Sequence, residues 1–302
     1  MIGRKQFGFM ASLDFARWPP EKVVAALADI GYGAVEWTLA QFDPRKGSTR
    51  DLERLVRLTR DGRLQVSELV VQQDLLTTDP ALRAERARLI EDCIVAAAAC
   101  GVEAINVFSG PATWEPGALR IPEEMAEGPA WDLLVRSYEP LVELAEKHKV
   151  HLALEPAFKM LCHDYYSTQE FFRRLDSEWL GINLDPSHLV LYGNDVPWVI
   201  RKWAEKIKHV HLKDVIGTVG NPGRDFMFPL LGEGLVPWDE FFASLEEIKY
   251  EGFLSVEFES FGYYARILGS DPCEAARLSM FQIERLLAGE KGKELDHGTV
   301  RG

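Results

Sequence analysis

The 302 residues carry 47 acidic and 34 basic side chains, a formal net charge of −13, which repels nucleic acids and anionic membranes at long range. The apolar fraction of 47% with 27% charged residues is typical of a globular protein and excludes a disordered chain. Neither a signal peptide nor an apolar run of the roughly 18 residues that span a membrane is found, so we expect a cytoplasmic protein with its four scattered cysteines reduced.

Short apolar or β-branched runs alternate with longer amphipathic segments, which is the pattern of repeated strand–helix units. Eight strands are predicted, in chain order at residues 6–12, 33–38, 64–71, 104–109, 151–156, 180–185, 207–213 and 252–259. Helix starts such as Asp79-Pro80 and helix stops such as Cys100-Gly101 lie between these strands.

Eight such units predict a single closed (β/α)8 barrel over residues 1–288, followed by a polar tail over 289–302. The alternative is an open, doubly wound sheet, but such a sheet usually has a glycine-rich phosphate loop after its first strand, and this sequence has none there. The longest segments without periodicity, 110–128 and 215–236, follow strands and are therefore expected on the face where barrels carry their sites.

The last four predicted strands each place polar side chains on one face. Alternate residues of a barrel strand point inward, and inward groups near the carboxyl end of a strand reach the mouth of the barrel. The inward polar residues are His151, Glu155, Asn183, Asp185, His209, His211, Lys213, Ser255, Glu257 and Glu259. His209 lies one layer deeper than His211, and we interpret it as a core histidine.

Several carboxylates at one mouth would repel one another and lose hydration unless a cation lies between them. Three carboxylates and one imidazole, without a thiolate, suit one divalent ion, for which we expect Mn²⁺, with Mg²⁺, Co²⁺ or Zn²⁺ as alternatives. Three negative ligands around a doubly charged ion leave one net negative charge. This favours a neutral polyol or keto-sugar over a polyanion as the substrate.

Four motifs carry a resemblance to a known family: Leu154-Glu155-Pro156, Asn183-Leu184-Asp185-Pro186-Ser187-His188, His209-Val210-His211-Leu212-Lys213-Asp214, and Tyr250-Glu251-Gly252 leading to Glu257. With these motifs the chain resembles the sugar phosphate isomerase/epimerase family of xylose isomerase-like TIM barrels, which includes ketose 3-epimerases, hydroxypyruvate isomerase and inosose dehydratase. The resemblance implies that the metal ligands are Glu155, Asp185, His211 and Glu257. It also implies that His188 contacts the substrate and that Arg224 binds a substrate oxygen.

Several further positions qualify this assignment. Glu259 shares the inward parity of Glu257 and is the alternative ligand in the eighth strand, but the Tyr-x-Gly-x4-Glu spacing favours Glu257. Lys213 and Glu36 are candidate substrate-binding residues, although Lys213 could instead balance charge, and Glu36, like Glu68, could form salt bridges across the mouth. Leu161 replaces an acidic substrate contact of the ketose 3-epimerases, which argues against a specific ketohexose 3-epimerase.

We therefore predict a metal-dependent isomerase or epimerase of a sugar or keto-sugar. Glu155 and Glu257 would move the proton through a metal-stabilised enediolate. The alternative is a lyase that expels water from a keto-inositol or the aglycone from a 3-keto-glycoside. An endonuclease IV-like phosphodiesterase and a non-enzymatic sugar-binding barrel fit less well, because the first needs more histidines and a basic groove. A homo-oligomer is compatible with each of these functions.

Overall fold

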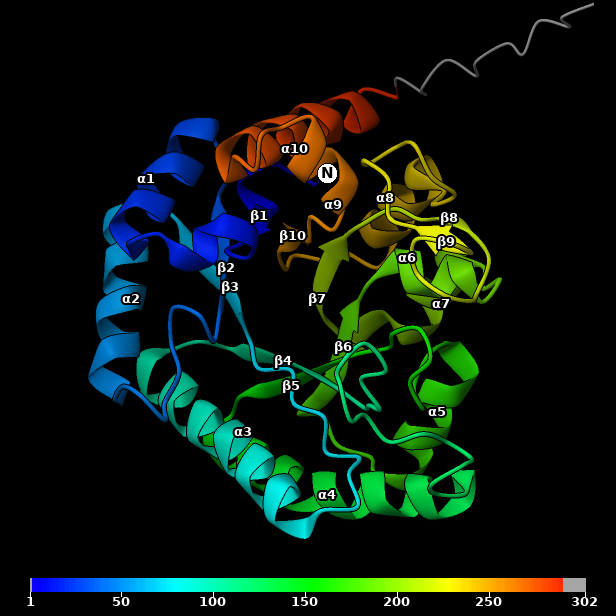
Figure 1. The fold of residues 1–302 in the computed structure, drawn as a ribbon. Helices are drawn as coiled ribbons and strands as arrows, with labels where there is room; N and C mark the ends of the chain where they lie inside the picture. The colour runs from blue at the N-terminus through cyan, green and yellow to red at the C-terminus, as the bar shows by residue number, and fades with distance from the viewer. Residues whose placement is uncertain (1, 290–302) are drawn as a thin grey trace, which may run out of the picture.

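The computed structural model describes residues 2–289, in which eight parallel strands close into a barrel surrounded by helices (Figure 1). The barrel strands in chain order are β1 (Phe7–Met10), β2 (Ala34–Thr38), β3 (Gln65–Val70), β4 (Ala104–Phe108), β5 (His151–Glu155), β6 (Leu180–Leu184), β7 (Ile207–Leu212) and β10 (Leu254–Val256). Each pairs with the next, and β10 closes the ring against β1. The predicted (β/α)8 barrel is confirmed, and the open-sheet alternative is wrong.

Helices follow the strands around the outside of the barrel. They are α1 (Pro20–Ile30), α2 (Thr49–Asp61), α3 (Pro80–Cys100), α4 (Glu127–His148), α5 (Tyr165–Arg174), α6 (Pro186–Leu191), α7 (Val196–Trp203), α8 (Trp238–Glu247), α9 (Phe261–Arg266) and α10 (Pro272–Leu287). Short 3-10 helices are η1 (Arg4–Gln6), η2 (Leu13–Arg17) and η3 (Ala204–Lys206).

The expected helix boundaries arise from local hydrogen bonds and backbone geometry. Helix α3 begins where the side chain of Asp79 accepts hydrogen bonds from the amides of Ala81 and Leu82, and it ends at Gly101, whose φ of 71° is left-handed. The last helix, α10, ends at Leu287, inside the predicted barrel domain. Of the predicted polar tail, residues 290–302 lie outside the described residues.

The segment 215–236, expected to be irregular, contains a small antiparallel hairpin. Its strands are β8 (Ile216–Gly217) and β9 (Phe226–Met227), and it lies beside α6 and α7 at the edge of the barrel (Figure 1). None of the helices in residues 2–289 is both long and apolar enough to span a membrane.

The two faces of the barrel strands differ in chemistry, and this difference positions the site. The outward side chains of β5, β6 and β7 are fully buried against the helices: Leu152, Leu154, Ile182, Leu184, Val210 and Leu212. Burying a side chain of this size stabilises the fold by about 1.5–3 kcal/mol. Because a one-residue slip would turn these groups inward, the outward face sets the register and allows the inward face to be polar.

The amino-terminal end of β5 gives a testable pH dependence. The His151 ring stacks on Trp179 with centroids 4.6 Å apart, and burial together with Lys208 lowers the pKa of His151 to about 4. The unfolded chain, where histidine has a pKa of about 6.5, therefore binds this proton first as the pH falls. We expect this residue to reduce the free energy of unfolding by about 1–2 kcal/mol between pH values of about 6.5 and 4.

Denaturant unfolding of the wild type and of His151→Phe across this pH range measures the contribution. The phenyl ring retains the stacking on Trp179 but does not titrate. The difference in unfolding free energy between the two proteins should change as the pH falls. A constant difference would contradict the assignment.

Candidate metal and active site

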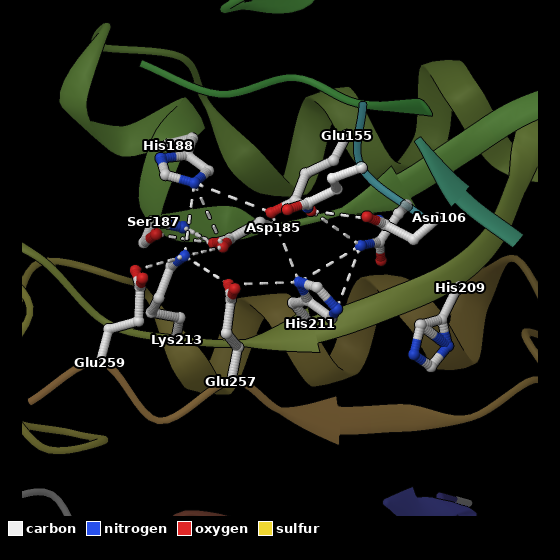
Figure 2. A network of polar contacts seen from close by, with 12 residues as sticks. Asn106, Glu155, Asp185, Ser187, His188, His209, His211, Lys213, Glu257 and Glu259 are labelled. Carbon is white, nitrogen blue, oxygen red and sulfur yellow. Dashed lines mark hydrogen bonds and ion pairs between the residues drawn. The ribbon is translucent and has the colours of Figure 1, made fainter. Parts of the chain in front are cut away.

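Four side chains from the last four barrel strands converge at the carboxyl mouth of the barrel (Figure 2). Glu155 ends β5, Asp185 follows β6, His211 lies in β7 and Glu257 follows β10. Each offers one ligand atom, and these atoms all lie within 4.8 Å of one another. The Nδ1 atom of His211 is 3.4 Å from Glu155 Oε1 and 3.3 Å from Glu257 Oε2. The structure thus brings together all four predicted ligands, which we call the mouth group.

The donor chemistry of the mouth group fits a divalent ion. Oδ1 of Asp185 accepts hydrogen bonds from the amide and hydroxyl of Ser187, and Oδ2 is the oxygen that forms an ion pair with Lys213. Three carboxylates and one imidazole are hard and borderline ligands of the kind that Mn²⁺, Mg²⁺ and Zn²⁺ accept.

Amide side chains hold Glu155 in this position. Gln72 Nε2 and Asn106 Nδ2 donate hydrogen bonds to Glu155 Oε2 at 2.8 and 3.1 Å, and Asn183 Nδ2 donates at 3.3 Å. Oε2 of Glu155 therefore accepts these hydrogen bonds, and Oε1 faces His211. Gln72 and Asn106 were not predicted from the sequence as part of the site. The inward parity of Asn106 within β4 was a usable signal, whereas Gln72 lies beyond the end of β3, where parity gives no guide.

The amide of Asn106 gives a prediction about metal affinity. Removing a residue that orients a ligand typically weakens metal binding 10- to 100-fold, so Asn106→Ala should raise the Mn²⁺ dissociation constant by about that factor in titration calorimetry. The matched control is Val107→Ala, which alters the buried outward face of the same strand. Equal Mn²⁺ affinity in the two variants would show that Asn106 does not orient Glu155.

Lys213 lies inside the acidic group and forms ion pairs there. Its Nζ atom is 2.9 Å from Asp185 Oδ2, 3.0 Å from Glu259 Oε2 and in close contact with Glu257. Burial alone would lower the pKa of Lys213, but Asp185, Glu257 and Glu259 outweigh it and raise the pKa well above its ordinary value. Lys213 was predicted to bind substrate, and the structure places it as a charged partner of these carboxylates.

The two glutamates that follow β10 have different environments. Although burial alone would raise the pKa of Glu257, Lys213 and His211 lower it below its usual range. Burial raises the pKa of Glu259 to about 7, against the opposing effect of Lys213. The structure places Glu257 in the mouth group, whereas Glu259 lies on the far side of Lys213 (Figure 2).

Of the other predicted substrate contacts, His188 lies at the mouth and Arg224 lies away from it. His188 Nε2 lies 3.6 Å from Asp185 Oδ2, and the His188 ring packs against Phe158 and Phe228, so His188 lines the mouth. Burial and the charge of Lys213 lower the pKa of His188, which favours the neutral ring. Arg224 is not brought to the mouth: its side chain is 74% exposed between β8 and β9 and pairs with the neighbouring Asp225.

Glu36 lies deeper in the barrel than predicted. It is fully buried, with Oε1 3.0 Å from His211 Nε2 and Oε2 3.0 Å from His209 Nε2. The carboxylate therefore contacts the side of the His211 ring that faces away from the mouth group. Such a contact fixes the orientation of a metal-binding imidazole.

Comparison with known proteins gives the family context. The family model described as xylose isomerase-like TIM barrel matches residues 24–279. Inosose dehydratase 2 of Bacillus cereus is 26% identical over 140 residues, which cover 43% of this chain and 47% of that protein. The putative L-ribulose-5-phosphate 3-epimerase SgbU of Escherichia coli is 26% identical over 179 residues, 59% of each chain. The chain thus spans about half the length of the curated relatives it matches.

A solved structure shares the whole fold. The IOLI protein with a bound zinc atom superposes with a TM-score of 0.71 at 16% sequence identity, over 94% of this chain and 99% of that chain. At this identity the likeness shows the fold alone. The relatives include both a putative epimerase and a dehydratase.

Proposed function

Because this chain belongs to the xylose isomerase-like TIM barrel family, we propose that it is a metal-dependent isomerase or epimerase of a sugar or keto-sugar. The observation that carries the proposal is the placement of Glu155 and Glu257 about His211, at 3.4 and 3.3 Å from its Nδ1 atom. Two carboxylates that share one ligand group can both reach the same substrate carbon.

We assign the metal to Glu155, Asp185, His211 and Glu257, with Mn²⁺ as the expected ion and Zn²⁺ as the alternative that a relative of the same fold contains. When bound, a divalent ion polarises a carbonyl as a Lewis acid and stabilises the negative charge of an enediolate. The side of His211 that faces Glu36 is separate from the side that faces these ligands.

The two glutamates carry the proton in this proposal. Strands β5 and β10 lie three positions apart around the ring of eight, so Glu155 and Glu257 approach the substrate from different directions. One removes the proton from the carbon beside the carbonyl, and the other returns a proton to the opposite face, which is epimerisation. Return to the adjacent carbon on the same face is aldose–ketose isomerisation. The charges of Lys213 and His211 keep Glu257 ionised before the reaction.

The walls of the mouth suit a neutral sugar. His188, packed against Phe158 and Phe228, offers a ring nitrogen to a hydroxyl group next to an apolar surface. Lys213 and Arg224 remain proposed substrate contacts, and for Arg224 this requires that its side chain leave Asp225. For Glu36 we propose a positioning role through His211 instead of a direct contact.

A lyase is the second candidate, and Glu259 is the observation that favours it. A carboxyl with a pKa of about 7 can donate a proton to a leaving hydroxyl near neutral pH. Elimination from the same enediolate would dehydrate a keto-inositol or release the aglycone of a 3-keto-glycoside. Release of water or of an aglycone therefore distinguishes the lyase from the isomerase or epimerase.

The proposal is tested with the Mn²⁺-loaded full chain in deuterated water, by screening ketoses, keto-inositols and 3-keto-glycosides and following the products by NMR. Deuterium entering the carbon beside the carbonyl, without loss of water or aglycone, supports the isomerase or epimerase. Stoichiometric elimination would establish the lyase instead. Cleavage of DNA containing abasic sites, or binding of sugars with neither exchange nor turnover, would overturn both.

A further inference from the structure

A second cluster of possible metal ligands lies inside the barrel, behind the mouth group. It consists of Glu36 from β2, Glu68 from β3, and His209 and His211 from β7, and we call it the interior group. One ligand atom from each lies within 4.8 Å of all the others, and the four side chains are at most 1% exposed. The two groups share His211, which directs Nδ1 toward the mouth and Nε2 toward Glu36.

Glu68 is the unexplained member of the interior group. Both of its carboxylate oxygens are buried without a hydrogen-bond partner among the described residues. Its Oε1 atom lies 3.6 Å from His209 Nε2 and 3.8 Å from His211 Nε2, which is too far for a hydrogen bond. A buried carboxylate without a donor is costly, so the two free oxygens point to a ligand that coordinates them.

The charge of the barrel interior gives a second, independent reason. The two groups contain five carboxyl groups, and the Lys213 ammonium group contacts two of them, which leaves a formal charge of −4 when the carboxyl groups are ionised and the histidines are neutral. One divalent ion in the mouth group reduces this to −2. A second divalent ion reduces it to zero.

We propose that the interior group binds a second divalent ion through Glu36, Glu68, His209 and the Nε2 atom of His211. Two carboxylates and two imidazoles suit Zn²⁺ or Co²⁺ in a tetrahedral arrangement. All four ligands come from the protein and all are buried, which is the pattern of a structural ion. The ion connects β2 and β3 to β7 and holds His211 from behind. When both sites are filled, His211 releases its ring N–H proton to water and contacts one ion through each nitrogen.

The interior ion requires no substrate and takes no part in the proposed reaction. With this ion bound, His209 is a metal ligand instead of a simple core histidine. Glu36 is likewise a ligand of the interior ion, and it remains one when the mouth ion is removed.

The test is a metal count on the full chain, stripped with a chelator, reloaded with Zn²⁺ and freed of excess ion by gel filtration. Inductively coupled plasma mass spectrometry should find two zinc ions per wild-type chain and one per chain of Glu68→Gln. The glutamine keeps the shape of the glutamate side chain. Asp185→Asn should also hold one ion, because it alters the mouth group alone. The matched control Ser67→Ala, on the same strand outside the interior group, should retain two. A wild type with one ion, or a Glu68→Gln variant with two, would overturn the proposal.

Anomalous scattering from Co²⁺-loaded crystals of the wild type gives a measurement that does not depend on the folding of a variant. A cobalt peak among Glu36, Glu68 and His209 supports the interior ion, and its absence rejects it. In Asp185→Asn the interior peak should persist without the mouth peak. A protein that binds the interior ion but turns over no substrate would contradict the proposed function and support the interior ion.

Discussion

Glu257→Gln is expected to lower turnover about 1000-fold, since a positioned proton carrier contributes roughly 10²–10⁴ to the rate and the variant also lacks a ligand charge. Glu155→Gln should have an effect of the same size. Each variant keeps one of the two carboxylates, so each should still exchange the proton of one epimer with solvent without converting it into the other. Steady-state kinetics at saturating Mn²⁺, with NMR detection of deuterium in each epimer, measures both effects.

Glu259→Gln is the matched control for the proton carriers, because Glu259 follows the same strand but lies beyond Lys213. For an isomerase or epimerase we expect a loss of less than about tenfold in this variant. A loss as large as that of Glu257→Gln would favour elimination with Glu259 as the acid. Retention of more than a tenth of the wild-type rate in Glu257→Gln would refute its role as a proton carrier.

Asp185→Asn is expected to weaken metal activation strongly while preserving the fold. Oδ1 of the asparagine can still accept the hydrogen bond from the Ser187 amide that caps α6, but the neighbouring amide nitrogen cannot bind a cation. Since even residues that only orient ligands contribute 10- to 100-fold to metal affinity, the Mn²⁺ concentration for half-maximal turnover should rise by at least about 100-fold.

Asp195→Asn provides the same substitution at a helix cap away from the mouth, where Asp195 accepts a hydrogen bond from the Trp198 amide in α7. Its Mn²⁺ activation should equal that of the wild type. Circular dichroism and thermal unfolding establish that both variants are folded. Equal activation curves for Asp185→Asn and Asp195→Asn would remove Asp185 from the ligand set.

Most of the fold and of the mouth group could be predicted because both depend on local patterns. Alternation places Glu155, Asp185, His211 and Glu257 on the inward faces near the ends of neighbouring strands, and closure of the ring brings neighbouring ends together. The same alternation could not give the depth of Glu36, because depth depends on how neighbouring strands are staggered. The pairing of β2 with β3 shifts register between Val35 and Trp37, at Glu36 itself.

The sequence by itself determined the barrel, since the order of the strands and a repeat of two along each strand suffice for it. The same repeat placed the mouth group on the inward face, but the choice of these four among the inward polar residues came from the family resemblance. Only the tertiary structure decided which groups surround them. Gln72 reaches Glu155 from a loop, Lys213 pairs with three carboxylates of other strands, and Glu68 lies without a donor beside His209. These contacts depend on loop paths and strand stagger, which are set by packing of the whole chain and have no local signature.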